Sequence, residues 1–272
     1  DLSHDVLTDQ GWLNIDEVTM YNKVATVNPK GEIEYHLPTR TIGYEVDEEM
    51  YEIENTLISQ CVTKNHSMYV SKRYGRAGIW QPYELVEAES IFGQRRKYKM
   101  DGINTYPDIE FHEFGGWKIP MDFWLQFLGI WIADGFANDT GVYIKVCRER
   151  KIEFITRILQ EIGVSYRTHM EKREGFLDQQ SFVITDKIWK YEFIALSKGA
   201  VNKSLPDYVW KLSQSQCRIL LDSLIEGDGT RGKTSEAYYT SSQKLADDIQ
   251  RLCTHAGYAG TLYTRYPAGT EF

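Results

Sequence analysis

The chain has 272 residues, 42% of them hydrophobic and 26% charged, and its formal net charge is −8. This length is sufficient for one large domain or two, each with a hydrophobic core. The acidic balance argues against a protein that simply coats nucleic acid. No apolar run is long enough to cross a membrane, and the first residues do not resemble a secretory signal.

The cysteines indicate where the protein works. They are scattered and form no Cys-x-x-Cys pair, which predicts free thiols in a reducing compartment. With no targeting signal in view, we expect a cytoplasmic protein. The four positions are Cys61, Cys147, Cys217 and Cys253.

Residues 1–72 are predicted to be all-β. Short β-rich runs such as KVATVNP and MYEIENTLIS are separated by turn signals, of which Asn28-Pro29-Lys30-Gly31 is the clearest. Residues 73–118 are rich in glycine, tyrosine and charge without a clean period. We expect them to hold the end of the β unit and a connection.

The periodicity changes at residue 120. The segment PMDFWLQFLGIWIADG (120–135) opens with Pro120 and an acid, both of which favour a helix start, and its large apolar residues recur at helical spacing. Gly135 follows the last turn, where a left-handed cap residue is expected. The segment therefore predicts a helix that ends at Asp134.

The elements that follow fall into two similar series. The first holds a strand in 140–150, a helix in 151–163 closed by Gly163, strands in 164–170 and 181–186, and a helix in 187–197. After Pro206 a second series begins. It holds a helix in 213–229 capped by Ser213 or Ser215 and closed by Gly229, a strand in 236–242, a helix in 244–257 and a strand in 261–266. Internal repetition on this scale indicates a duplicated architecture.

The first helix of each series ends in the same way. FLGIWIADG (127–135) and LDSLIEGDG (221–229) both finish in Asp-Gly and both carry small residues four positions apart. Small residues at this spacing share one helical face and let two backbones approach closely. If the helices pack along these faces, Asp134 and Asp228 meet at the same end. The small residues are Gly129, Ala133, Ser223 and Gly227.

The placement of these acids is electrostatically unfavourable. Unpaired carbonyls give the C-terminal end of a helix a partial negative charge, so Asp134 and Asp228 call for a positive partner. Two carboxylates at two such ends are relieved by hard divalent cations, and carboxylates that converge on metal suit phosphodiester hydrolysis. For one copy, Asp-Gly is a common cap sequence of a core helix. The matched second copy favours a site.

At these residues the chain resembles a known family. The two segments are similar to the paired motifs of LAGLIDADG (DOD-type) homing endonucleases, over about residues 118–272. The resemblance implies a pseudo-twofold endonuclease of repeated α-β-β-α units, with subdomains at about 118–205 and 206–272, the second truncated. In this family the final acid of each motif binds the catalytic metals. It therefore implies Asp134 and Asp228 as catalytic residues and as ligands of Mg²⁺ (or Mn²⁺).

A third residue of the implied site precedes the second motif. NKSLPDYVWKLS (202–213) is similar to the Lys-x-Ile-Pro block of intein-borne members, although Leu205 stands where isoleucine is usual. The resemblance makes Lys203 a candidate catalytic lysine, because an ammonium near the scissile phosphate stabilises negative charge or orients water. From the residues alone, Lys203 is a surface lysine before a proline turn.

The N-terminal part resembles another module. SHDVLTDQGWLNIDEV (3–18) is similar to the opening of an intein's protein-splicing domain, and VTKNHSMYV (62–70) to its second block. The resemblance implies a Hint-like all-β domain over residues 1–117. There Thr63 and His66 assist splicing by polarising the first peptide bond and protonating its leaving nitrogen. Without that resemblance, a lone histidine in a strand is a packed or surface residue.

The resemblance to inteins has gaps. The family needs a Cys or Ser as its first residue, and this chain begins at Asp1; the terminal His-Asn pair and the following nucleophile are also missing. We expect that the chain as given does not splice itself.

The leading hypothesis is an α+β, intein-type, site-specific endonuclease that cuts both strands of long double-stranded DNA as a monomer with internal pseudo-symmetry. The alternative is a protein-splicing intein whose endonuclease has decayed. A DNA-binding regulator without catalysis ranks last, because such a relic would be expected to lose the acids. Polar strand residues are either contacts to phosphates and base edges or ordinary surface residues: Tyr143, Lys145, Arg148, Arg167, His169 and Lys172.

Basic clusters accompany these strands. Lys145, Arg148, Arg150 and Lys151 lie together in KVCRERK (145–151). Taken alone, the cluster is typical of solvated surface charge. In an acidic chain it also permits DNA binding with a strong dependence on salt.

Overall fold

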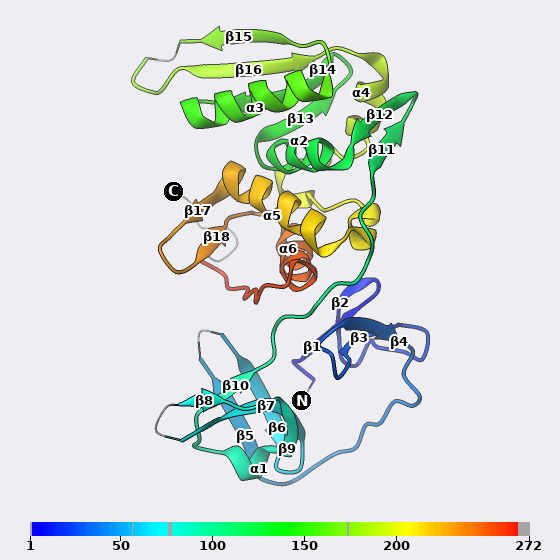
Figure 1. Cartoon of the computed structure of the whole chain (residues 1–272), viewed down its shortest axis with the longest axis vertical. Coiled ribbons are helices and arrows are strands. Elements are labelled where there is room, and N and C mark those ends of the chain that lie inside the picture. The colour runs from blue at the N-terminus through cyan, green and yellow to red at the C-terminus, as the bar shows by residue number, and fades with distance from the viewer. Residues whose placement is uncertain (1, 56, 76–77, 173, 266–272) are drawn as a thin grey trace. The chain divides into compact units, whose positions relative to one another are not determined.

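The computed structural model describes residues 2–55, 57–75, 78–172 and 174–265, and the chain divides into two compact units (Figure 1). One unit comprises the residues up to Gly102 together with the described residues from Tyr258 onward, and the other comprises Ile103–Gly257. The division falls earlier than the expected boundary after residue 117. The reason is that Phe114 and Trp117 already pack against the core of the second unit.

The first unit is rich in β-strands, as the sequence predicts. Its elements are β1 (Asp5–Thr8), β2 (Gly11–Asn14), β3 (Val24–Val27), β4 (Ile33–His36), β5 (Met50–Glu54), β6 (Ser59–Thr63), β7 (Ser67–Tyr74), β8 (Ile79–Trp80), β9 (Glu84–Glu87), α1 (Ala88–Ile91) and β10 (Arg96–Tyr98). One antiparallel sheet has the order β2-β1-β3-β4, β5 pairs with β6, and β7 pairs with β8, β9 and β10. The stretch after residue 73 therefore holds more regular structure than its irregular period indicates.

The second unit carries the duplicated order. Its elements are β11 (Phe111–Phe114), β12 (Trp117–Pro120), α2 (Met121–Asp134), β13 (Gly135–Asn138), β14 (Gly141–Val146), α3 (Glu149–Ile162), β15 (Arg167–Glu171), β16 (Gln179–Ile184), α4 (Lys187–Ile194), the 3₁₀ turns η1 (Ala200–Asn202) and η2 (Asp207–Lys211), α5 (Gln214–Asp228), β17 (Gly229–Arg231), β18 (Glu236–Tyr238) and α6 (Gln243–Ala256). The order helix-strand-strand-helix occurs at α2-β13-β14-α3 and again at α5-β17-β18-α6. The first copy extends into a sheet of order β13-β14-β16-β15, whereas β17 and β18 pair alone.

Local signals explain where the predicted helices begin and end. Ser213 caps α5, since its side-chain oxygen accepts from the backbone N–H of Gln216 at 3.2 Å. Helices α3 and α6 end at Gly163 and Gly257, whose φ angles of 75° and 80° are left-handed. These boundaries confirm the expected helices. The expected strand at 261–266 is wrong over the part that is described, because residues 261–265 form no strand; residue 266 lies outside the described residues.

The glycines after the two acids differ from the expectation of left-handed caps. Gly135 and Gly229 are extended, with φ of −106° and −111°, because a strand begins at each of them directly after the helix. A Cβ at Gly135 would lie 2.3 Å from Cδ1 of Trp131, and one at Gly229 would lie 2.6 Å from Cα of Ile225. Glycine is therefore required because the new strand runs close against the last helical turn.

Helices α2 and α5 pack along the small faces that the sequence identifies, and they lie side by side in Figure 1. A Cβ on Gly129 would lie 2.6 Å from Cβ of Ser223, and one on Gly227 only 2.2 Å from Cβ of Ala133. The hydroxyl of Ser223 donates to the carbonyl oxygen of Gln126, so it is satisfied inside the contact. The backbones approach as closely as glycine allows.

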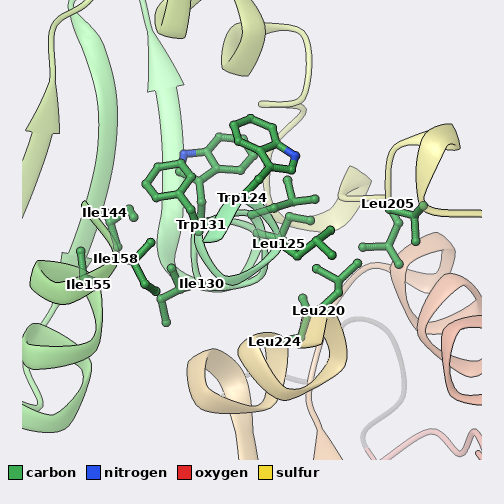
Figure 2. Close-up of a cluster of buried hydrophobic side chains, with 14 of the residues drawn as sticks. Trp124, Leu125, Ile130, Trp131, Ile144, Ile155, Ile158, Leu205, Leu220 and Leu224 are labelled. Carbon is green, nitrogen blue, oxygen red and sulfur yellow. The ribbon is translucent and has the colours of Figure 1, made fainter. Parts of the chain in front are cut away.

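Large apolar side chains surround this contact. Figure 2 shows Leu125 and Trp124 of α2 together with Leu220 and Leu224 of α5 in one cluster. All four are fully buried, and they belong to a core that continues into α3, α4 and α6. Burial of side chains of this size contributes about 1.5–3 kcal/mol each to the free energy of unfolding. No helix among the described residues is long and apolar enough to span a membrane.

A substitution at the contact tests its closeness. We expect Gly227→Val to lower the free energy of unfolding of the second unit by about 2 kcal/mol, since its side chain would overlap Ala133. Gly43→Val is the matched control, because a Cβ at Gly43 meets nothing within 4 Å. Urea unfolding followed by fluorescence of the buried Trp124 and Trp189 measures the difference. Equal stability of the two variants would contradict the close packing.

Candidate active site

Two carboxylates lie at the adjoining C-terminal ends of α2 and α5. Asp134 is the last residue of α2 and Asp228 is the last residue of α5, and both are half-buried. Burial raises the pKa of Asp228, and the charge of Asp134 raises it further, while Lys151 and Lys203 oppose the increase. The structure thus brings the two predicted acids within electrostatic reach of each other.

Lys203 reaches the same place from the segment before η2. Its Nζ donates to the carbonyl oxygen of Ala133 at 2.7 Å, one residue before Asp134. Burial lowers the pKa of Lys203, and the charges of Asp228 and Asp134 act in the opposite direction. The lysine therefore neutralises one of the unpaired carbonyls at the end of α2 while it lies in the field of both acids.

The backbone around Lys203 is held in place by α6. The hydroxyl of Ser242 donates to the carbonyl oxygen of Lys203 at 2.7 Å, and Asp248 accepts from the backbone N–H of Leu205 at 2.9 Å. Both side chains, the hydroxyl that donates and the carboxylate that accepts, come from α6 and its N-cap in the second repeat. Lys203 is therefore positioned by the fold and does not behave as a free surface lysine.

Lys151 was grouped with a surface cluster by the sequence, yet it belongs to this site. Its Nζ lies 2.6 Å from Oδ2 of Asp134, and only 11% of its side chain is exposed. Lys151 lies in the first turn of α3, on the buried face that continues with Ile155 and Ile158. A lysine four residues before a buried isoleucine is the signal that could have identified it.

A neighbouring ion pair joins α3 to the second motif. Arg150 contacts the carboxylate of Glu226, two residues before Asp228. Tyr238 of β18 completes the surroundings, since burial raises its pKa and the charges of Asp228 and Asp134 raise it further. Both repeats therefore contribute residues around the acids.

A pocket of about 240 Å³ opens beside this cluster. Its lining comes from residues between Trp131 and Phe136, and from residues between Leu196 and Pro206 that include Lys198 and Lys203. A cavity with two lysines and an aromatic wall can accept an anionic group next to the acids.

The donor set fits a hard divalent cation. Among the described residues no group of three or more His, Cys, Asp or Glu side chains converges on one point, so the protein offers only two carboxylates here. Mg²⁺ is commonly held by one or two carboxylates, with water and phosphate oxygens as its other ligands. Asp134 and Asp228 are therefore the residues that would hold such an ion.

Four of the six predicted DNA-contacting residues share one face of the four-stranded sheet. Across the register, Tyr143 is opposite Val183, which is opposite Arg167. Likewise Lys145 is opposite Ser181, which is opposite His169. Directly paired residues of an antiparallel sheet point to the same side. The face therefore carries Tyr143, Lys145, Arg167 and His169.

The other two predicted residues lie elsewhere. Arg148 is the N-cap of α3, and Lys172 follows the end of β15. The sequence also missed Phe136, whose ring stacks on that of Tyr143 at a centroid distance of 4.8 Å. Phe136 is 38% exposed, so the shared face presents an aromatic pair as well as charges. We call this set, Phe136 with the four residues above, the sheet face.

The predicted splicing residues lie in the first unit. The Thr63 hydroxyl donates to Oδ1 of Asn65 at 2.9 Å, and the carbonyl oxygen of Thr63 accepts from the backbone N–H of His66 at 3.0 Å. His66 is exposed, and the desolvation that it does experience lowers its pKa, to which the charge of His4 adds. The structure therefore brings Thr63 and His66 together and adds His4 to them.

Comparison with known proteins gives sequence relatives. No family model matches the chain. The chain is 34% identical over 292 aligned residues to an "ATP-dependent Clp protease proteolytic subunit" of Chlamydomonas moewusii, covering 95% of this chain and 28% of that protein. It is 31% identical over 321 aligned residues to a "DNA-directed RNA polymerase subunit beta C-terminal section" of Stigeoclonium helveticum, covering 96% of this chain and 29% of that protein. The chain thus spans less than a third of either relative.

Solved structures give a weaker likeness. A crystal structure of I-DmoI in complex with DNA and Mn is 14% identical, with a TM-score of 0.35 over 49% of this chain and 76% of that chain. A variant of I-DmoI with its target DNA is 12% identical, with a TM-score of 0.36 over 49% of this chain and 74% of that chain. Both scores are low, and the fold described above depends on this chain's own geometry.

The raised pKa of Asp228 predicts a pH-dependent effect of its charge on stability. An acid whose pKa is higher in the folded state stabilises the fold below its ordinary pKa, and this contribution is lost as the pH rises through the raised value. We therefore expect Asp228→Asn to raise the Tm at neutral pH, and the gain to shrink as the solution is acidified. Asp222→Asn, at an exposed acid of α5 paired with Arg231, should give no such gain. A lower Tm for Asp228→Asn at neutral pH would contradict the assignment.

Proposed function

We propose that this chain is an intein-type LAGLIDADG homing endonuclease, which hydrolyses phosphodiester bonds in both strands of double-stranded DNA at a specific site with Mg²⁺ or Mn²⁺. The observation that carries the proposal is the convergence of Asp134, Asp228 and Lys203 at the adjoining ends of two closely packed helices. A structural cap would not require a second acid and a half-buried lysine at the same place.

The residues of the site have separate roles in this proposal. A bound divalent cation would supply Lewis-acid stabilisation of the phosphate oxygens and a more acidic water. Asp134 and Asp228 would each hold a divalent cation, one for each DNA strand. The ammonium of Lys203 stabilises negative charge that develops on the scissile phosphate or orients the attacking water at one of the two strands.

The sheet face gives the proposal a surface for DNA. Lys145 and Arg167 contact phosphates, and the aromatic pair Phe136 and Tyr143 adds apolar contact area beside them. The ammonium of Lys145 lies 5.8 Å from the ring centroid of Phe136, which keeps the charge on this face. Because the formal charge of the chain is −8, binding depends on these local cations and falls steeply with added salt.

The sequence relatives support the proposal that this chain is a mobile element inserted into host genes. Segments similar to nearly the whole of this chain, 34% and 31% identical, occur in two proteins with unrelated names, a protease subunit and an RNA polymerase subunit. A segment shared by proteins with nothing else in common in their names is typical of an insertion. An intein carries its endonuclease from one host gene to another, which accounts for this distribution.

A second function, protein splicing, is favoured by the grouping of Thr63, His66 and His4 in the first unit. In this proposal Thr63 polarises the first peptide bond and His66 protonates its leaving nitrogen. The lowered pKa of His66 makes its protonated form a stronger acid, which favours transfer of that proton. The full-length gene, placed between two halves of a reporter, tests this function. Release of a ligated reporter that His66→Ala abolishes would establish it.

Substitution of the two acids tests the proposed endonuclease activity. We expect Asp134→Asn and Asp228→Asn each to reduce cleavage of the uninterrupted host gene by at least about 10²-fold with Mg²⁺, because each removes a ligand of the cation that stabilises the transition state. Lys203→Met should reduce cleavage as well, and Lys211→Met, at the end of η2, is the matched control. Cleavage is followed by gel analysis of plasmid ends. Cutting by both Asn variants at the wild-type rate would show that these acids are not catalytic.

Salt dependence tests the sheet face. We expect Lys145→Gln and Arg167→Gln each to reduce the slope of log K against log salt by about 1, since each removes one phosphate contact. Lys172→Gln, which lies beyond the end of β15, should leave the slope unchanged. Fluorescence anisotropy with labelled duplex measures the slope between 50 and 200 mM salt, about the range over which such effects are large. Equal slopes for all three variants would show that the sheet face does not contact DNA phosphates.

A further inference from the structure

The two acids of the site are unlike in their contacts. Oδ2 of Asp134 is 2.6 Å from Nζ of Lys151, in an ion pair whose side chains are only 18% and 11% exposed. Throughout the part of the chain that the structure describes, the carboxylate of Asp228 makes no hydrogen bond and no ion pair; only its backbone oxygen accepts, from the N–H of Tyr239. One half of a duplicated site is thus occupied by a protein cation and the other half is not.

The fold holds Lys151 in this position. Its backbone N–H donates to the carbonyl oxygen of Arg148 at 3.0 Å in the first turn of α3, and its neighbour Arg150 is tied to Glu226 of α5. The stem of Lys151 lies on the buried face of α3 in line with Ile155. The ammonium is therefore presented to Asp134 by a docked helix, which distinguishes it from a surface lysine that samples many rotamers.

An ammonium and a divalent cation compete for the same carboxylate, because both are positive and repel each other at this distance. A cation that binds at Oδ2 of Asp134 must displace Nζ of Lys151, and one that binds through Oδ1 is repelled by the ammonium beside it. The carboxylate of Asp228 has no such ion-pair partner among the described residues. The ion pair is largely shielded from water, so its loss is costly. The difference between the halves does not follow from the repeated motif, because the residue responsible lies outside both motif helices.

We propose that Lys151 is a resident counter-ion that competes with divalent metal at Asp134, so that the two halves of the site load in a fixed order, with Asp228 first. The proposal rests on the proposed function in one respect, that these acids are metal ligands. It adds that the DNA strand served by Asp228 is cut before the other, so that nicked DNA accumulates when metal is limiting. Lys151 acts through Asp134, and its role is that of a positioning residue.

Metal binding without DNA tests the order. Mn²⁺ alone is titrated into the full chain and followed by isothermal titration calorimetry and by the electron paramagnetic resonance signal of free Mn²⁺. We expect a tighter and a weaker binding event for the wild-type chain. Lys151→Met, which keeps the length of the stem, should tighten the weaker event by about tenfold and leave the tighter one unchanged.

Three further variants identify the events. Lys187→Met, at an exposed lysine of α4 away from the two acids, is the matched control, and it should alter neither event. Lys151→Arg keeps the charge and should leave the weaker event weak. Asp134→Asn, made with Lys151 intact, should remove only the weaker event, and this result does not depend on whether Lys151→Met folds. Asp228→Asn should remove the tighter one.

The outcomes separate this inference from the endonuclease itself. Unchanged or weakened binding in a folded Lys151→Met chain would overturn the inference, as would two equal events in the wild-type chain or no Mn²⁺ binding in any variant. Ordered binding in a chain that cuts no DNA would uphold the order and refute the endonuclease. Cleavage of both strands without a nicked intermediate at limiting Mn²⁺, together with equal binding events, would uphold the endonuclease and refute the order.

Discussion

The close contact between α2 and α5 is the constraint on which the site depends. Gly227 against Ala133, and Gly129 against Ser223, leave no room for another carbon between the helices. A wider separation would carry the two helix ends apart, and with them Asp134 and Asp228. The buried aromatic and leucine side chains around the contact supply the favourable burial that offsets the cost of placing like charges together.

That cost is reduced further by charge pairing inside the site. Asp134 has Lys151, and Lys203 neutralises the carbonyl end of α2 while it lies in the field of both acids. Two carboxylates and two ammonium groups balance formally, so the cluster carries its own counter-charge. This distinguishes the centre from structural metal sites, in which the bound ion contributes the folding energy.

Much of this architecture could be predicted from the sequence. Helical spacing and capping residues located α2, α3, α5 and α6 to within a few residues, and the doubled Asp-Gly identified the acids. The strands β13 and β17 were missed because each begins at the glycine that was assigned to a helix cap. Lys151 was missed because its partner is set by how α3 docks, and Arg148 and Lys172 were grouped with the sheet because strand ends are poorly marked in the sequence.

Asp134 ends a helix and Gly135 begins a strand of the four-stranded sheet, with no loop residue between them, and Asp228 and Gly229 repeat the arrangement. Each carboxylate is thus attached to a β-ribbon without a flexible joint. A change in the twist of either β-ribbon therefore also moves the carboxylate at its start. The fit of the strands to a bound ligand and the position of the carboxylate are coupled.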